Sequence, residues 1–170
     1  MDKVISIDAE TDGLWGKPFA IGAKVYSVVD DEHKEIDSIL VRLDDSVVTN
    51  RWVIDNVLPS IKDVDVTHAV YIDMLKTFAD FYMKHKGATT LWHMGHVVEA
   101  YLFRELVSYN LIGEFDAPYT PIEVSELLRI ECQDPASVDN YLSERGIKIA
   151  GEPHNPLYDC EAAFKAYSML

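Results

Sequence analysis

Two acidic residues near the start of the chain, Asp8 and Glu10, have the spacing of a pair of metal ligands. They follow the mainly apolar run Val4–Ile7, which is typical of a short buried strand. Because side chains alternate along a strand, residues two apart leave the same face and can converge on one cation. Hard divalent ions prefer such oxygen ligands. An Asp-x-Glu triplet also arises often by chance on solvated strand ends, so this pair alone does not establish a metal site.

A second pair that could do chemistry lies near the C-terminus, where His154 stands five residues before Asp159. The imidazole of a histidine titrates near neutrality. Beside a carboxylate-bound metal it is therefore suited to accept a proton from the metal's water. Each residue also has a simpler interpretation. Asp159 would cap a helix or interact with its dipole, and His154 would be an ordinary loop residue.

The first quarter of the chain is predicted to form three strands that position Asp8 and Glu10. The strands are expected over Val4–Ile7, Phe19–Val29 and Ile36–Leu43. The connection Thr11–Pro18 contains two glycines and a proline, which is typical of a hairpin-like turn. Three successive strands of this kind indicate an antiparallel meander.

From about residue 50 the apolar residues repeat at helical spacing, beginning with Trp52, Val53, Val57 and Ile61. Strands first and alternating elements later indicate an α/β fold, with a mixed sheet of an antiparallel meander and parallel strands flanked by helices. The further predicted elements are helices over Ala69–His85, Val97–Asn110 and Tyr158–Leu170, a helix capped by Ser137, and a strand over Ala88–Trp92.

The length of 170 residues fits one domain spanning residues 1–170. The first residues lack the basic start and long apolar stretch of a signal peptide, and no apolar run is long enough to span a bilayer. The two cysteines, Cys132 and Cys160, are too few for a disulfide framework and do not have the spacing of a structural zinc site. These features predict a cytoplasmic protein with no membrane partner.

The formal net charge of −14 disfavours tight binding to long nucleic acids, because that binding depends on cationic contacts to phosphate. A carboxylate site contributes negative charge that bound cations partly cancel, and a short single strand needs few phosphate contacts. The charge is therefore compatible with catalysis on the end of a strand.

Together the two pairs resemble the motifs of the DEDDh 3′→5′ exonucleases. This family of the ribonuclease H-like superfamily includes the DNA polymerase III proofreading subunit, RNase T, oligoribonuclease and several phage and bacterial exonucleases. Its first motif resembles residues 5–14, and its next strand, with an Ile-Gly pair, resembles residues 19–23. The third motif, His-x-x-x-x-Asp, matches His154 and Asp159. The tyrosine of the sister subgroup would fall at Asn155, so the resemblance implies a histidine mechanism and a ribonuclease H-like fold.

The second motif departs from the family pattern, which places an aspartate in the first turn of a helix. The register that best fits the apolar residues on both sides sets Glu99 at that position. Glutamate keeps the carboxylate but reaches one methylene farther, so it would bind a cation directly or through water. The alternative register sets Gly95 there and leaves the site one ligand short.

The resemblance implies that Asp8, Glu10, Glu99 and Asp159 hold two divalent cations, Mg²⁺ or Mn²⁺, with His154 as the general base. The substrate would be the 3′ end of single-stranded nucleic acid, which the enzyme would shorten by releasing nucleoside 5′-monophosphates. The residues that the resemblance places against the terminal nucleotide are Thr11, Leu14 and Trp15.

Three questions stay open from the sequence. No residue in the sequence indicates a contact with the 2′-hydroxyl, so DNA and RNA are both candidate substrates. Several relatives are homodimers, which makes a second copy of the chain a possible partner. The replacement of the usual aspartate by Glu99 also leaves open a catalytically weakened binding module that keeps the exonuclease fold.

Overall fold

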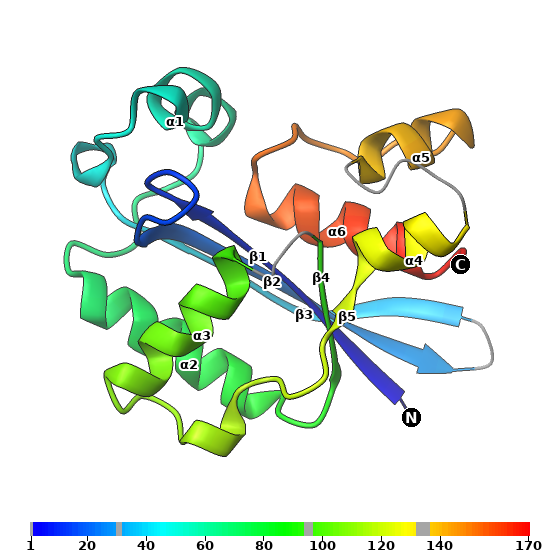
Figure 1. Ribbon diagram of the computed structural model, residues 1–170, viewed down its shortest axis with the longest axis horizontal. Coiled ribbons are helices and arrows are strands. Elements are labelled where there is room, and N and C mark those ends of the chain that lie inside the picture. Colours follow the sequence, from blue (N-terminus) through cyan, green and yellow to red (C-terminus); the bar gives the residue numbers. More distant parts are fainter. Residues whose placement is uncertain (1, 30–31, 94–96, 132–136) are drawn as a thin grey trace.

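A five-stranded mixed sheet forms the centre of the computed structural model, which describes residues 2–29, 32–93, 97–131 and 137–170 (Figure 1). The strand order is β3-β2-β1-β4-β5, with β1 to β3 antiparallel and with β4 and β5 each parallel to the preceding strand in that order. This sheet confirms the predicted fold class. The strands are β1 (Asp2–Thr11), β2 (Pro18–Val29), β3 (Glu32–Arg42), β4 (Thr89–Trp92) and β5 (Ile122–Glu123).

The strands differ in detail from the predicted ones, and β1 extends beyond the predicted Val4–Ile7 to Asp2–Thr11. β3 begins at Glu32, four residues before the predicted Ile36, because polar residues of the predicted tip already pair with β2 as far as Val29. β5 was not predicted, because a strand of two residues beside prolines carries no periodic signal. The parallel pairing of Leu91 with Ile122 is a tertiary contact that local sequence does not encode.

Helices cover both faces of the sheet, with α2 and α3 on one side and α6 on the other beside α4 and α5 (Figure 1). The final helix begins at Pro156, two residues before the predicted start, and Ser137 caps its helix as predicted by accepting a hydrogen bond from the Asn140 backbone N–H at 3.0 Å. No helix in the described ranges is long and apolar enough to cross a membrane. The helices are α1 (Arg51–Asn56), α2 (Tyr71–Lys84), α3 (Val98–Ser108), α4 (Val124–Ile130), α5 (Val138–Glu144) and α6 (Pro156–Tyr167).

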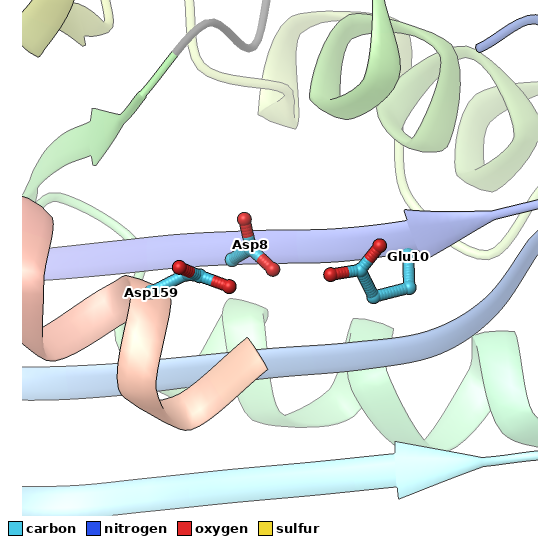
Figure 2. A group of neighbouring side chains, drawn as sticks. All are labelled: Asp8, Glu10 and Asp159. Carbon is cyan, nitrogen blue, oxygen red and sulfur yellow. The ribbon is translucent and has the colours of Figure 1, made fainter. Parts of the chain in front are cut away.

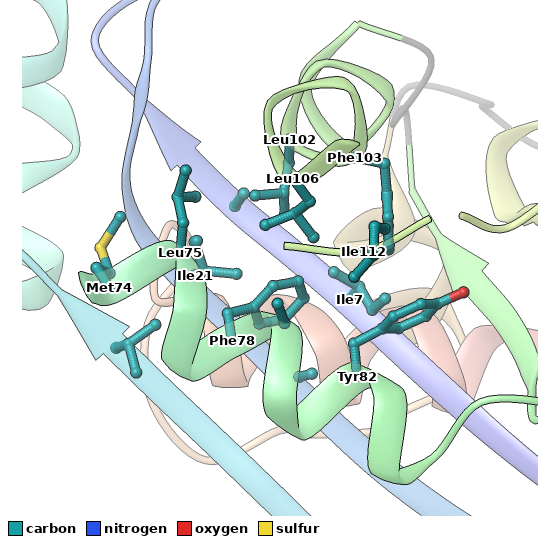
Figure 3. Close-up of a cluster of buried hydrophobic side chains, with 14 of the residues drawn as sticks. Ile7, Ile21, Met74, Leu75, Phe78, Tyr82, Leu102, Phe103, Leu106 and Ile112 are labelled. Atoms are coloured by element: carbon teal, nitrogen blue, oxygen red, sulfur yellow. The ribbon is translucent and has the colours of Figure 1, made fainter. Parts of the chain in front are cut away.

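The alternation of β1 sends its residues to two different environments. Ile5, Ile7 and Ala9 point into the main core, where they pack with Phe78 of α2 and Leu102 of α3 (Figure 3). The residues between them belong to the opposite face, where α6 packs on β1 and where Val4 joins a separate buried cluster with Phe164 of α6. This second face carries Asp8 and Glu10 at its C-terminal end.

The segment after β3 packs beside the turn between β1 and β2 through Val53, Val57 and Ile61, all at most 2% exposed. Trp52 precedes Val53 by one residue, which turns it about 100° away around a helix. It is 58% exposed, so its predicted place in the same apolar repeat was wrong. The buried guanidinium of Arg42 donates a hydrogen bond to the carbonyl of Ile61, which fixes this segment to the end of β3.

Candidate active site

Asp8 and Glu10 on β1 meet Asp159, which lies in the first turn of α6 (Figure 2). Each of the three carboxylates offers an oxygen, and these oxygens all lie within 4.8 Å of one another. One divalent cation can bridge oxygens at this spacing. The structure therefore brings together three of the carboxylates that the sequence placed in a metal site.

Gly22 of β2 allows α6 to approach the sheet closely enough for this meeting. It pairs with Asp8 across the β1–β2 register. A Cβ atom at Gly22 would lie 2.6 Å from the Cβ atom of Pro156, which is closer than side chains can pack. One turn later the Cys160 thiol lies 3.5 Å from the Gly22 carbonyl oxygen. The first turn of α6 thus packs directly on β2, and this contact sets Asp159 beside the end of β1.

Burial and mutual repulsion raise the pKa values of two of these carboxyl groups. Burial raises the pKa of Asp8 well above its usual range, and the charges of Asp159 and Glu10 raise it further. Burial and the Glu10 charge also raise the pKa of Asp159 to about 7, against the opposing effect of His154. The shielded Oδ2 atom of Asp8 has no hydrogen-bond partner among the described residues. A divalent cation would relieve this repulsion and supply the missing partner, so the group fits a cation site.

Glu99 lies in the first turn of α3 and is 2% exposed. Its Oε1 atom accepts a hydrogen bond of 3.2 Å from the backbone N–H of Ala9, between Asp8 and Glu10. Its Oε2 atom is shielded and has no hydrogen-bond partner in the described part of the chain. Glu99 is not in the tight group of three carboxylates, although it lines the same hollow. The alternative motif-two residue, Gly95, lies outside the described residues.

Replacing Glu99 with glutamine is expected to stabilise the metal-free protein at high pH. Burial raises the pKa of Glu99 from 4.5 to about 8, so the folded protein keeps a proton that the unfolded chain has released between these values. The free energy of unfolding therefore falls as the pH rises through that window. Glutamine does not titrate, so it removes this loss. The free energy of unfolding of Glu99→Gln should exceed that of the parent by roughly 2–4 kcal/mol at pH 9 and differ little from it at pH 5.

Denaturant unfolding in EDTA at both pH values measures this difference. The amide oxygen of glutamine can still accept the hydrogen bond from Ala9. Glu144→Gln, which makes the same chemical change at an exposed position, is the matched control and should show no pH-dependent gain. A Glu99→Gln protein that is less stable than the parent by the same amount at pH 5 and pH 9 would contradict the expectation.

His154 lies in the loop before α6 and faces the carboxylates. Its backbone has a positive φ of 66°, a conformation that non-glycine residues adopt only at a cost. Its Nδ1 atom is 3.6 Å from Oε1 of Glu10, and the contact with this carboxylate raises the pKa of the imidazole. The ring also contacts the ring of Trp52, with centroids 5.7 Å apart and planes at 90°. The sequence predicted the nearness of His154 to the carboxylates and missed the contact with Trp52.

A hollow of about 460 Å³ beside the carboxylates is lined by all five residues of the predicted site. It is also lined by Asp139, whose carboxylate accepts a hydrogen bond of 2.7 Å from the Tyr158 hydroxyl. Sequence reasoning missed Asp139 because no motif marks it, although Ser137, two residues earlier, was recognised as a helix cap. The five residues are Asp8, Glu10, Glu99, His154 and Asp159.

A second, more apolar hollow of about 360 Å³ adjoins the first and shares Glu10, Leu14 and His154 with it. Two of the three predicted substrate-binding residues line it. Thr11 is 8% exposed and its hydroxyl donates a hydrogen bond to the Gly13 carbonyl, whereas Leu14 is 61% exposed and lines both hollows. Trp15 is 76% exposed and lines neither of these two hollows.

No family model matches the sequence, and no curated protein sequence matches it either. Several solved structures are similar to the chain. The nuclease domain of 3′hExo, a DEDDh family member bound to rAMP, superposes with a TM-score of 0.71 at 14% identity, over 99% of this chain and 90% of that chain. Exonuclease X in complex with 5′ overhanging duplex DNA has a TM-score of 0.57 at 20% identity, over 98% and 90% of the two chains.

A third similar structure is product-bound exonuclease I, with a TM-score of 0.64 at 11% identity. The match covers 98% of this chain but 42% of exonuclease I, so the similarity concerns one part of that protein. Identities this low make the similarity one of fold. The sheet order and the covering helices of this chain are thus those of an exonuclease domain.

Proposed function

We propose that this chain, which has the fold of the DEDDh 3′-exonucleases, is a metal-dependent 3′→5′ exonuclease that acts on single-stranded DNA or RNA. The observation that carries the proposal is the convergence of Asp8, Glu10 and Asp159 within 4.8 Å in a hollow that His154 also lines. Proteins of similar fold are described with rAMP, with histone mRNA stem-loop and with duplex DNA. A nucleic-acid strand end is therefore the substrate class that fits both the fold and the residues.

Asp8, Glu10 and Asp159 would hold two divalent cations, Mg²⁺ or Mn²⁺, and Glu99 would assist directly or through water. Bound cations of this kind activate a water molecule and stabilise the departing 3′ oxygen of the strand. Asp8 and Glu99 each have a shielded oxygen without a hydrogen-bond partner in the described ranges, and a bound cation would satisfy these oxygens, which supports the assignment.

His154 would act as the general base that takes the proton from the attacking water. It lines the same hollow as the carboxylates, and its Nδ1 atom is 3.6 Å from Glu10. An imidazole exchanges protons near neutral pH, which suits this role. The water oxygen would bond to the phosphorus while the bond from phosphorus to the 3′ oxygen of the preceding nucleotide breaks. The shortened strand would keep a 3′ hydroxyl, and a nucleoside 5′-monophosphate would leave.

The more apolar hollow would receive the terminal nucleotide. Leu14 lines both hollows and is well placed to contact the nucleotide at the point where its phosphate reaches the carboxylates. Thr11 would contribute through the turn that its hydroxyl bond to Gly13 supports, and the exposed ring of Trp15 on the same turn would stack on a base.

The test is digestion of single strands of matched DNA and RNA sequence, labelled at the 5′ end, with Mg²⁺, Mn²⁺ or EDTA. The proposal predicts a ladder that shortens from the 3′ end only when a divalent ion is present, with nucleoside 5′-monophosphates as products. A strand blocked at its 3′ end should resist digestion. A well-folded protein that leaves both strands intact with either ion would overturn the proposal, and one that binds strands without cutting them would instead be a binding module.

A further inference from the structure

Trp52 is a large aromatic side chain on the surface whose position the core does not explain. It is 58% exposed, while its neighbours Val53 and Val57 are at most 2% exposed and make the packing contacts of α1. Its ring nevertheless contacts the ring of His154, edge to face, with centroids 5.7 Å apart and planes at 90°. The contact joins residues 102 positions apart in the sequence, and an edge-to-face pair of this kind is favourable.

His154 needs such a contact, because the other interactions that hold it are weak or conditional. Its loop backbone has a φ of 66°, which costs energy for a residue with a Cβ atom. Apart from this ring contact, the described contact of its imidazole with the carboxylates is with Glu10, at 3.6 Å. A cation held by Glu10 would compete with the imidazole for that carboxylate. The ring contact with Trp52 does not depend on the carboxylate.

Trp52 is in turn fixed to the turn that follows Glu10. The Asp12 carboxylate accepts hydrogen bonds from the Thr49 N–H and hydroxyl and from the Asn50 N–H, at 2.7–2.9 Å. Asn50 then caps α1, with its side-chain oxygen accepting from the Trp52 N–H at 3.0 Å. Gly13 has a φ of 82°, and a Cβ atom there would lie 2.6 Å from the Asn50 amide nitrogen. These contacts therefore tie the turn after β1 to the start of α1.

We infer that Trp52 is a positioning residue that holds the His154 imidazole beside the carboxylates of Asp8, Glu10 and Asp159. The inference rests on the proposed function, in which His154 takes a proton during hydrolysis. Trp52 would act through His154, because its ring contacts the imidazole. It would not act through the cations, because the oxygens that would hold them come from Asp8, Glu10 and Asp159. Loss of Trp52 should therefore lower kcat and leave metal affinity unchanged.

The test compares Trp52→Ala with Trp52→Phe in the full chain. Trp52→Ala is expected to lower kcat roughly 3- to 10-fold, the rate equivalent of one aromatic pair. KM for a short strand is measured beside it, because Trp52 also lines the more apolar hollow. Trp52→Phe keeps an aromatic ring at the same position and should restore most of kcat. The matched control is Phe115→Ala, which removes an 85% exposed aromatic ring from the segment between α3 and β5 and should change neither constant.

A second readout reports on His154 directly. In a protein with ¹³C-labelled histidines, the ring resonance of His154, assigned with His154→Ala, should shift in Trp52→Ala because the ring current of the indole is lost. Calorimetry with Mn²⁺ should give the parent affinity for Trp52→Ala. An unmoved His154 resonance, or a Trp52→Ala protein with the parent kcat, would overturn the inference while leaving the proposed function intact. A parent protein that cleaves no strand would overturn both.

Discussion

Replacing Asp8 with asparagine is expected to lower kcat about 1,000-fold or more and also to stabilise the metal-free protein at pH 8. Asp8 lies within 4.8 Å of two other carboxylates and has a shielded oxygen that no described residue hydrogen-bonds. In the proposed site it would hold cations, so asparagine removes a charged ligand from the centre of the reaction. The same replacement removes a buried negative charge that destabilises the metal-free folded protein.

The stability effect has a definite dependence on pH. Burial and the charges of Asp159 and Glu10 raise the pKa of Asp8 in the folded protein. At pH values between the pKa of Asp8 in the unfolded chain and its raised pKa in the folded protein, the unfolded chain binds fewer protons than the folded one. The free energy of unfolding of the parent therefore falls as the pH rises. Asparagine does not titrate, and its stabilising effect should therefore be larger at pH 8 than at pH 5.

Two measurements check this prediction, namely kcat on a labelled strand with Mn²⁺ and denaturant unfolding in EDTA at pH 5 and pH 8. Asp63→Asn makes the same chemical change at an exposed position and should alter neither. The expectation fails if Asp8→Asn keeps turnover within tenfold of the parent. It also fails if the stability difference between the two proteins does not grow with pH.

The sequence was sufficient to predict most of the fold because its strands and helices have clear periods. The alternation of Val4 to Glu10 places acidic residues on one face of β1, and the helical spacing of Ala69–His85 nearly matches α2. β5 was out of reach, since Ile122 and Glu123 form a strand only by pairing with β4. The periodicity of apolar residues indicates which side of one helix or strand is buried. It does not indicate a two-residue pairing with a distant strand.

The candidate site shows a similar division between local and tertiary information. The nearness of Asp8, Glu10 and Asp159 was predictable because a motif resemblance links segments far apart in the chain. The contact of Trp52 with His154 was not predictable, because it joins an exposed side chain next to the buried Val53 to a loop 102 residues later. Spacing identifies the apolar face of a helix, but it does not show which residue beside that face contacts a neighbouring loop.

The acidic character of the chain is partly a property of this site. Burial raises the pKa of Glu99 to about 8, so the metal-free pocket keeps a proton at pH 7 that the formal charge of −14 does not count. Cations bound there would displace that proton and add positive charge where, in the proposed reaction, a phosphate approaches. A site of this kind would hold the end of one strand with few cationic side chains on the surrounding surface, because it would contact few phosphates.

Replacing His154 with alanine is expected to lower kcat about 100- to 10,000-fold, which is the usual contribution of a general base. Metal affinity should stay close to that of the parent, because His154 is not among the three carboxylates that converge within 4.8 Å. Folding should change little, since the imidazole is 44% exposed. This combination separates the histidine from Asp8, whose loss should weaken both turnover and cation binding.

The measurements are kcat against pH on a labelled strand, calorimetry with Mn²⁺, and thermal unfolding. A base must be neutral to accept a proton, so parent activity should rise with pH through the titration of an imidazole, and this rise should be absent in His154→Ala. His33→Ala, at an exposed position of β3, is the matched control and should keep the parent profile. A folded His154→Ala protein that digests the strand at the parent rate would remove the histidine from the mechanism, because hydrolysis would then proceed at full speed without the imidazole beside Glu10.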